Sequence, residues 1–268
     1  MSTALNVEAR RHGKLYWALA DGFVLAKRNL VQIPRIPELL VFATIQPVMF
    51  VLLFRYVFGG AIDVGGDSYV NYLMAGIFVQ TVAFGAVATG VGLAQNLQKG
   101  RVDRFRSLPM ARSAVLTGRT IADLVRNLFV VLVMLLVGLL VGFRPEAGLA
   151  GWAAAIGLLL LLSFSFSWIG ATIALLMRST EAVQSAGFIW LFPLTFASSA
   201  FVQTDNMPGW LEAFADHQPM TQVIDAVRAF LLDQPVGSHG WQALAWCVGI
   251  LVVFIPLSVS LYRRVAAR

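Results

Sequence analysis

Six stretches of apolar residues, each long enough to form a membrane-spanning helix, alternate with shorter polar segments along the chain. As a helix, residues 39–57 would extend roughly 28 Å, which matches the thickness of a hydrocarbon core. The predicted spans are residues 39–57, 69–97, 121–141, 152–177, 184–201 and 244–261. This pattern predicts an all-α integral membrane protein with six transmembrane helices, because a backbone in lipid must satisfy its hydrogen bonds internally.

Two polar segments carry apolar faces of their own. Apolar residues recur at helical spacing within residues 15–31, which predicts an amphipathic helix in the membrane interface, although a short solvated helix would give the same pattern. Residues 202–243 predict two further short helices, which either dip into the outer membrane surface or cap the bundle. The predicted domains are a cytoplasmic tail with its interfacial helix, residues 1–38, and a six-span domain, residues 39–268.

The composition requires lipid as part of the solvent. Hydrophobic residues make up 58% of the 268 residues and charged residues only 13%, and the mean hydropathy is +0.75. In a typical soluble domain about a quarter of the residues are charged. The net charge is +6, which in a soluble protein would suggest nucleic acid as the partner. In a membrane protein, the positions of the basic residues relative to the spans are more informative, and we expect no nucleic acid as a partner.

The charges predict which side of the membrane each polar segment faces. Basic residues dominate the N-terminal tail, residues 98–127 and the C-terminal tail, whereas acidic residues dominate residues 58–68 and 202–243. Segments rich in lysine and arginine stay in the cytoplasm. Six spans with both termini inside satisfy this rule, so we expect a multi-pass protein of the cell membrane with cytoplasmic N- and C-termini.

The sequence contains no recognisable catalytic centre. The three histidines, His12, His217 and His239, are scattered, and the single cysteine, Cys247, lies in an apolar stretch. Neither a phosphate-binding G-x-x-x-x-G-K-[ST] loop nor an H-E-x-x-H metal motif is present. Ionisable groups, which ion-driven carriers need inside their spans, occur only near the span ends. We predict no catalytic, cofactor or metal site in this chain, so the energy for any transport must come from another chain.

Two features within the spans are candidates for a substrate path. Gln46 precedes Pro47 in the middle of the first span, where the proline could kink the helix beside the path; a proline simply packed against its neighbours is the alternative. Phe188, Phe192 and Phe196 recur every four residues and therefore share one face of the fifth span. Such a stripe is typical of core packing, which we favour over a surface that faces the substrate.

The longest basic interruption, residues 98–127, separates the second span from the third. It contains Gly100, Arg101, Asp103, Arg104, Phe105, Arg106, Ser107, Leu108 and Pro109. A second motif, residues 218–228, begins with Gln-Pro-Met-Thr, contains Asp225 and Arg228, and precedes the last span. In residues and relative position, both motifs closely resemble those of type-2 ABC exporter permeases, above all the daunorubicin-resistance branch of actinobacteria. The chain departs from the family pattern at Asn96 and Gln98, where members often have acidic residues, and at Gln218, where asparagine is usual.

The resemblance implies a permease that exports hydrophobic or amphipathic compounds, a drug or a lipid, together with a second permease subunit and two ATP-binding subunits. ATP and magnesium would bind to the partner ATPase, and the two permeases would form a homodimer or a heterodimer. Residues 100–109 would form a coupling helix that docks in a groove of the ATPase, with Phe105 and Leu108 as apolar anchors. Alternatively, the arginines of this segment only bind the headgroups of anionic membrane lipids.

Two other functions are compatible with the same sequence. One is a membrane channel or scaffold that needs no ATPase, and co-purification of an ATP-binding partner would argue against it. The other is an ABC exporter that moves polysaccharide on a lipid carrier, which would favour a wide channel lined with aromatic rings. The residues do not distinguish a drug from a lipid as the substrate.

Overall fold

The computed structural model describes residues 37–60, 62, 68–98, 112–177 and 179–265. The predicted interfacial helix, residues 15–31, and the predicted coupling helix, residues 100–109, lie outside the described residues. Every regular element in the described part of the chain is helical, which agrees with the predicted all-α class.

Long helices follow one another along the chain with short connections. Their bounds are Pro37–Leu53 (α3), Tyr69–Gln98 (α4), Arg112–Val141 (α6), Leu149–Leu176 (α7), Thr180–Phe196 (α8), Gly209–His217 (α9), Pro219–Leu231 (α10) and His239–Val265 (α11). A π-helical turn, Phe54–Phe58 (η2), extends α3, and a 3₁₀ turn, Thr204–Asn206 (η3), precedes α9. Each predicted span overlaps one long helix, and α9 and α10 are the two predicted short helices.

Four helical segments in the described residues are long and apolar enough to cross a membrane: Tyr69–Gln98, Ala122–Val141, Leu149–Leu176 and His239–Tyr262. The apolar part of α3 and η2, Thr44–Phe58, is shorter, and α8 has 17 residues. The structure is therefore that of a multi-pass helical membrane protein, whereas the arrangement of all six spans in the bilayer stays a prediction.

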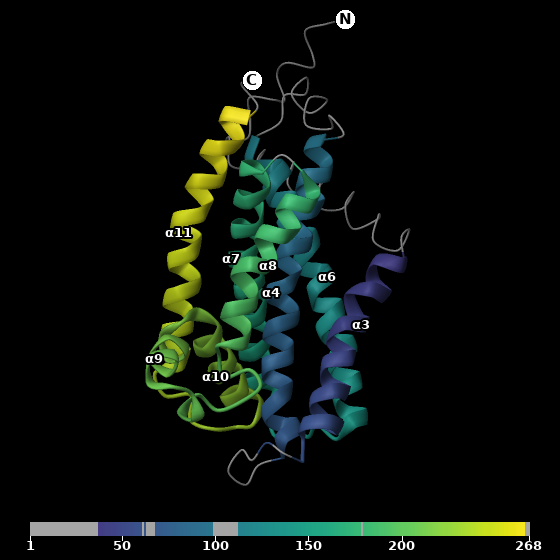
Figure 1. Cartoon of the computed structure of the whole chain (residues 1–268), viewed down its shortest axis with the longest axis vertical. Helices are drawn as coiled ribbons and strands as arrows, with labels where there is room; N and C mark the ends of the chain where they lie inside the picture. The colour runs from purple at the N-terminus through teal and green to yellow at the C-terminus, as the bar shows by residue number, and fades with distance from the viewer. Residues whose placement is uncertain (1–36, 61, 63–67, 99–111, 178, 266–268) are drawn as a thin grey trace, which may run out of the picture.

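Helix α4 lies in the centre of the bundle. It packs against α6, α7, α8 and α10, while α3 and α11 lie on opposite sides (Figure 1). The closest approach joins α4 to α7, because a Cβ atom on Gly90 would lie only 2.8 Å from the carbonyl oxygen of Gly170. A Cβ atom on Gly170 would in turn overlap the carbonyl of Ala86. Small residues thus let the two helices pack backbone to backbone.

The serines of α7 bond to its neighbours, as is usual for hydroxyl groups in membrane helices. Ser163 Oγ accepts a hydrogen bond of 2.8 Å from Asn127 of α6, and Ser165 Oγ donates to the carbonyl of Cys247 in α11 at 3.1 Å. Ser167 Oγ lies 3.5 Å from Thr89 Oγ1 of α4. The row of serines therefore connects α7 to three different helices.

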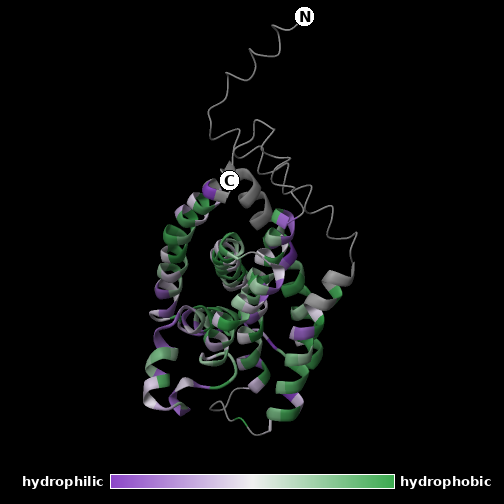
Figure 2. Cartoon of the chain, turned by 45° about the horizontal axis from the view of Figure 1, so that its top comes forward, coloured by the Kyte–Doolittle hydropathy of each residue, from purple (hydrophilic) through white to green (hydrophobic). Residues whose placement is uncertain are grey.

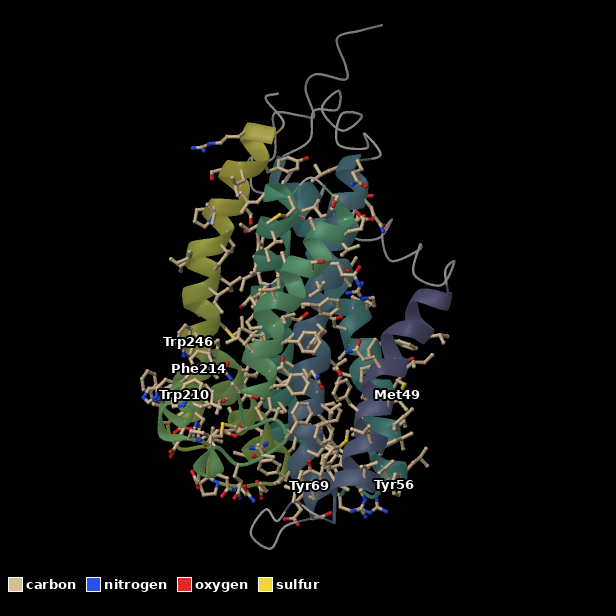
Figure 3. The ribbon with its side chains drawn as sticks, viewed as in Figure 1. Met49, Tyr56, Tyr69, Trp210, Phe214 and Trp246 are labelled. Atoms are coloured by element: carbon tan, nitrogen blue, oxygen red, sulfur yellow. The ribbon has the colours of Figure 1, made fainter. Side chains whose placement is uncertain are left out.

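The outward faces of the bundle are apolar. Figure 2 shows hydrophobic residues along α3 and α11, the two helices at the sides. Met49 on α3 and Tyr56 on η2 project away from the bundle and are largely exposed (Figure 3). Trp210 and Phe214 of α9 and Trp246 of α11 are also exposed, at the end of the bundle where α11 begins (Figure 3). Apolar surface on this scale requires lipid or a partner protein as its neighbour.

The end of one predicted span needs correction. The fifth span was expected to continue to residue 201, but α8 ends at Phe196, and Ser198 Oγ donates to the carbonyl of Thr195 in the turn that follows. Gly138 and Gly142 have the G-x-x-x-G spacing that lets membrane helices approach closely, but Gly142 has a φ of 107° and terminates α6. Only Gly138 lies within the helix, against the side chain of Met74.

Candidate functional site

Phenylalanine rings from four segments meet along one side of the bundle. They form a contiguous set, here called the aromatic ladder: Phe50, Phe54, Phe58, Phe84, Phe188, Phe192, Phe196 and Phe201. The distance between centroids of contacting rings ranges from 4.3 Å for Phe54 and Phe201 to 6.3 Å for Phe50 and Phe196. These separations are typical of favourable aromatic pairs.

The stripe predicted on α8 forms the middle of the ladder. Phe188 and Phe192 both contact Phe84 of α4, with ring centroids 5.8 and 5.7 Å apart, and Phe196 reaches Phe50 of α3. Phe192 and Phe196 are each 43% exposed. The stripe therefore packs against the core along one edge and is open along the other, so it is more than a buried packing surface.

Gln46, the other residue proposed for the substrate path, is exposed on α3. It lies four residues before Phe50, so the two share a face of the helix. Pro47 is buried, and α3 continues through it without interruption, which agrees with a proline packed against its neighbours. The predicted path residues thus come from two helices, α3 and α8, that meet at the ladder.

The first residue of the second motif, Gln218, contacts the end of α8. Gln218 Nε2 donates to the carbonyl oxygen of Leu194 in the last turn of α8 at 2.9 Å and to that of the C-cap residue Ala197 at 3.2 Å. Its Oε1 accepts from the backbone N–H of Met220 at 3.0 Å and so caps the start of α10. Glutamine thus performs both tasks at the position where the family usually has asparagine.

Arg228, near the end of the same helix, joins three elements. Its guanidinium group donates to Asp225 Oδ1 at 2.5 Å, to the carbonyl of Ser199 at 2.6 Å and to the carbonyl of Tyr72 at 3.3 Å. The group also lies 3.7 Å from the centre of the Tyr72 ring, a cation–π contact. Asp225 accepts a further bond from Ser199 Oγ at 2.7 Å. We call Gln218, Asp225 and Arg228 the polar clamp.

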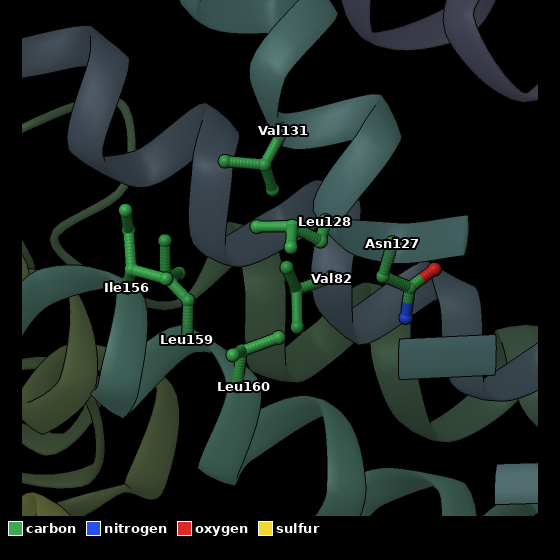
Figure 4. A pocket seen from close by; sticks show the side chains of 7 residues that line it. All are labelled: Val82, Asn127, Leu128, Val131, Ile156, Leu159 and Leu160. Carbon is green, nitrogen blue, oxygen red and sulfur yellow. The ribbon is translucent and has the colours of Figure 1, made fainter. Parts of the chain in front are cut away.

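A second polar group lies near the middle of the bundle, where α6 meets α4 and α7. Arg126 pairs with Asp123 at 3.3 Å and donates to the carbonyl of Gly85 at 3.2 Å. Asn127 beside it lines a cavity of about 10 Å³ together with apolar residues (Figure 4): Val82, Leu128, Val131, Ile156, Leu159 and Leu160. A cavity of this size holds at most one water molecule and is far too small for a drug.

The long apolar helices, the apolar outer faces and the aromatic ladder define a class of protein, the multi-pass helical membrane protein. Residues 21–232 match the family described as ABC-2 type transporter, and the chain belongs to this family. The family resemblance predicted from the sequence is therefore confirmed.

Similar proteins agree with this assignment. The chain is 35% identical over 241 residues to the daunorubicin resistance ABC transporter permease protein DrrB1 of Streptomyces coeruleorubidus, covering 88% of this chain and 84% of that protein. It is 30% identical to the probable doxorubicin resistance ABC transporter permease protein DrrC of Mycobacterium tuberculosis (strain ATCC 25618 / H37Rv), covering 83% and 80%. With the putative transport permease ycf38 of Cyanophora paradoxa it shares 26% identity, covering 84% and 78%.

The predicted coupling residues, 100–109, fall between the end of α4 at Gln98 and the start of α6 at Arg112, and they lie outside the described residues. Their role stays a prediction. The rest of the ladder was not predicted from the sequence. Phe50 and Phe54 carried a usable signal, since they share the four-residue spacing of the α8 stripe. The second motif, residues 218–228, contains all three clamp residues, but their contacts were not predicted, although Asp225 and Arg228 lie one helical turn apart.

Proposed function

We propose that this chain is the membrane permease subunit of an ATP-driven exporter that moves hydrophobic or amphipathic molecules, an aromatic drug or a lipid, out of the cytoplasm or the inner leaflet. The family membership and the drug-resistance names of its relatives support export as the function. The aromatic ladder is the structural observation that carries the proposal, because it offers stacking surfaces beside the lipid.

The substrate path runs along the ladder, with Gln46, Phe188, Phe192 and Phe196 in contact with the transported molecule. The open edges of Phe192 and Phe196 support this assignment, since a ring that is already half exposed can stack on a planar ligand without unfolding its helix. A second permease subunit covers this side of the bundle, so that the path lies between two copies of the fold.

ATP hydrolysis in a partner subunit drives transport through the segment between α4 and α6. Residues 100–109 dock on a separate ATP-binding subunit, which holds ATP and magnesium and carries out the hydrolysis. The strongly basic character of this segment and the absence of a phosphate-binding loop from the sequence support this division of labour. Six spans with both termini in the cytoplasm place the segment on the side of the membrane where ATP is found.

Transport into inside-out membrane vesicles tests the proposal. Vesicles that contain this chain and its ATPase should take up daunorubicin in the presence of ATP but not in the presence of a non-hydrolysable analogue. Replacing both Phe192 and Phe196 with leucine keeps the surface apolar but removes two rings, and should lower the uptake about tenfold, from roughly 0.5–1.5 kcal/mol per aromatic contact.

The matched control is Phe129→Leu, which changes an exposed ring on α6 outside the ladder and should leave uptake unchanged. Equal uptake by the wild-type protein and the double variant would show that the ladder is not the path. Uptake of daunorubicin that needs no ATP would instead indicate a channel.

A further inference from the structure

Four buried polar side-chain atoms in the described residues have no hydrogen-bond partner: Gln80 Nε2, Thr195 Oγ1, Trp168 Nε1 and Trp190 Nε1. Such atoms are costly inside a membrane, because no bulk water can satisfy them. Both tryptophan rings pack edge-to-face against phenylalanines of α7. Gln80 and Thr195 belong instead to α4 and α8, the two helices that carry the centre of the aromatic ladder.

Helices α4 and α8 are antiparallel and closely packed. At one end of their seam, a Cβ atom on Gly76 would overlap the backbone of Ala200, just beyond α8. At the other end, a Cβ atom on Gly187 would lie 2.8 Å from the side chain of Val87. These two contacts fix which positions of α4 and α8 lie at the same level.

The register brings Gln80 and Thr195 to the same level of the seam. Gln80 lies one helical turn from Gly76 on the same face of α4, and Thr195 lies in the last turn of α8, just before the bend that leads to Ala200. Thr195 is also two turns beyond Gly187, which faces α4, so its side chain belongs to the buried face of α8. Gln80 is 4% exposed and Thr195 is 0% exposed, so the seam is closed around both.

The aromatic ladder borders this polar pair. Phe84 follows Gln80 by one turn on α4, and Phe192 and Phe196 flank Thr195 on α8. A molecule stacked on these rings therefore has two hydrogen-bond donors immediately behind its aromatic surface. Pro193 weakens α8 at this level, because it has no N–H for the carbonyl of Ile189, so the end of the helix can move away from α4.

We infer that Gln80 and Thr195 form a polar subsite that donates hydrogen bonds to an uncharged acceptor, such as a carbonyl oxygen, on the transported amphiphile when α8 separates from α4. The inference rests on the proposed export function and deepens it, since it specifies an aromatic molecule that carries a hydrogen-bond acceptor. In the closed seam the two donors have no partner, and the substrate supplies one, which favours the separated arrangement only when substrate is present.

Equilibrium binding to the full chain in lipid nanodiscs tests the inference with two probes. Daunorubicin is planar and carries quinone oxygens, whereas the tetraphenylphosphonium cation offers aromatic rings and no hydrogen-bond acceptor. Gln80→Met and Thr195→Val keep the shape of each side chain but remove its donor. Each variant should bind daunorubicin about five- to tenfold more weakly, the value of one hydrogen bond, and bind tetraphenylphosphonium as the wild type does.

Gln95→Met is the matched control, because Gln95 is an exposed glutamine on the same helix, and this variant should bind both probes normally. The melting temperatures of Gln80→Met and Thr195→Val should be unchanged or higher, since each substitution removes a buried group without a partner. A lower melting temperature, or an equal loss of both probes, would mean that the two side chains only support the fold and would overturn the inference.

The outcomes separate this inference from the proposed function. If Phe192→Leu weakens the binding of both probes while Gln80→Met changes neither, the ladder is the path and the polar subsite is wrong. If the wild-type chain binds neither probe, both the proposed substrate path and the polar subsite are wrong.

Discussion

Replacing Arg228 with methionine is the most direct test of the polar clamp. Arg228 and Asp225 have side chains that are 11% and 22% exposed, so the pair is largely withdrawn from solvent. The substitution keeps an apolar stem of similar length. It leaves the carboxylate of Asp225 with the Ser199 hydroxyl but without its cationic partner, and it removes the guanidinium donor from the carbonyls of Tyr72 and Ser199. Removing one partner of a buried ion pair costs about 3–5 kcal/mol, and the residual exposure of Asp225 favours the lower end.

Cys247 provides an internal reporter for this loss. It is the single cysteine of the sequence, it is fully buried in α11, and α10, which carries Arg228, packs against that helix. A thiol-reactive dye can label Cys247 only when the structure opens. A loss of about 3 kcal/mol should increase the labelling rate about a hundredfold and lower the melting temperature by about 6–12 °C.

Two further variants make the result specific. Arg144→Met removes an exposed arginine from the same end of the bundle. The side chain of Arg144 donates to the carbonyls of Leu139 and Phe143 in its own segment, so this variant should change the labelling rate less than fivefold. The double variant Asp225→Asn/Arg228→Met no longer contains an unpaired charge and should recover part of the stability. If Arg228→Met labels no faster than Arg144→Met, the clamp does not stabilise the fold.

Three other predictions follow from the packing and from the motifs. Gly170→Ala should abolish the monodisperse peak in size-exclusion chromatography, because its Cβ atom overlaps a backbone carbonyl of α4, whereas Gly157→Ala, which meets open space, should elute normally. Asn127→Leu removes the donor to a buried serine of α7 and should lower stability by about 1 kcal/mol in thermal unfolding. Replacing Phe105 and Arg106 with alanine should stop ATP-dependent transport without reducing membrane insertion; unchanged transport would contradict a coupling role for residues 100–109.

The positions of the helices could be predicted closely from the sequence. Residues 69–97 were predicted as a span and α4 extends from Tyr69 to Gln98, because a long apolar stretch in lipid has few alternatives to a helix. The end of α8 was less predictable. Apolar residues continue beyond Phe196, but the Ser198 hydroxyl competes for a backbone carbonyl and the chain turns toward α10.

The candidate site shows what helical periodicity in the sequence cannot predict. The four-residue spacing of Phe188, Phe192 and Phe196 establishes that they share a face, but it contains no information on which helix lies opposite that face. Only the packing of α8 brings Phe84 and Phe50 against the stripe and leaves its other edge open. The choice between a core stripe and a path therefore depends on contacts between helices.

By itself, then, the sequence determined the membrane class, the helix positions and the family, because each depends on local composition or on a contiguous motif. The tertiary structure alone decided that Arg228 would meet Tyr72, a residue 156 positions earlier, and that Phe192 of α8 would meet Phe84 of α4. Such contacts depend on which faces of neighbouring helices pack together, and several faces of each helix are similarly apolar. Small residues such as Gly90 and Gly170 determine which faces can approach closely, and a hydropathy pattern does not reveal this.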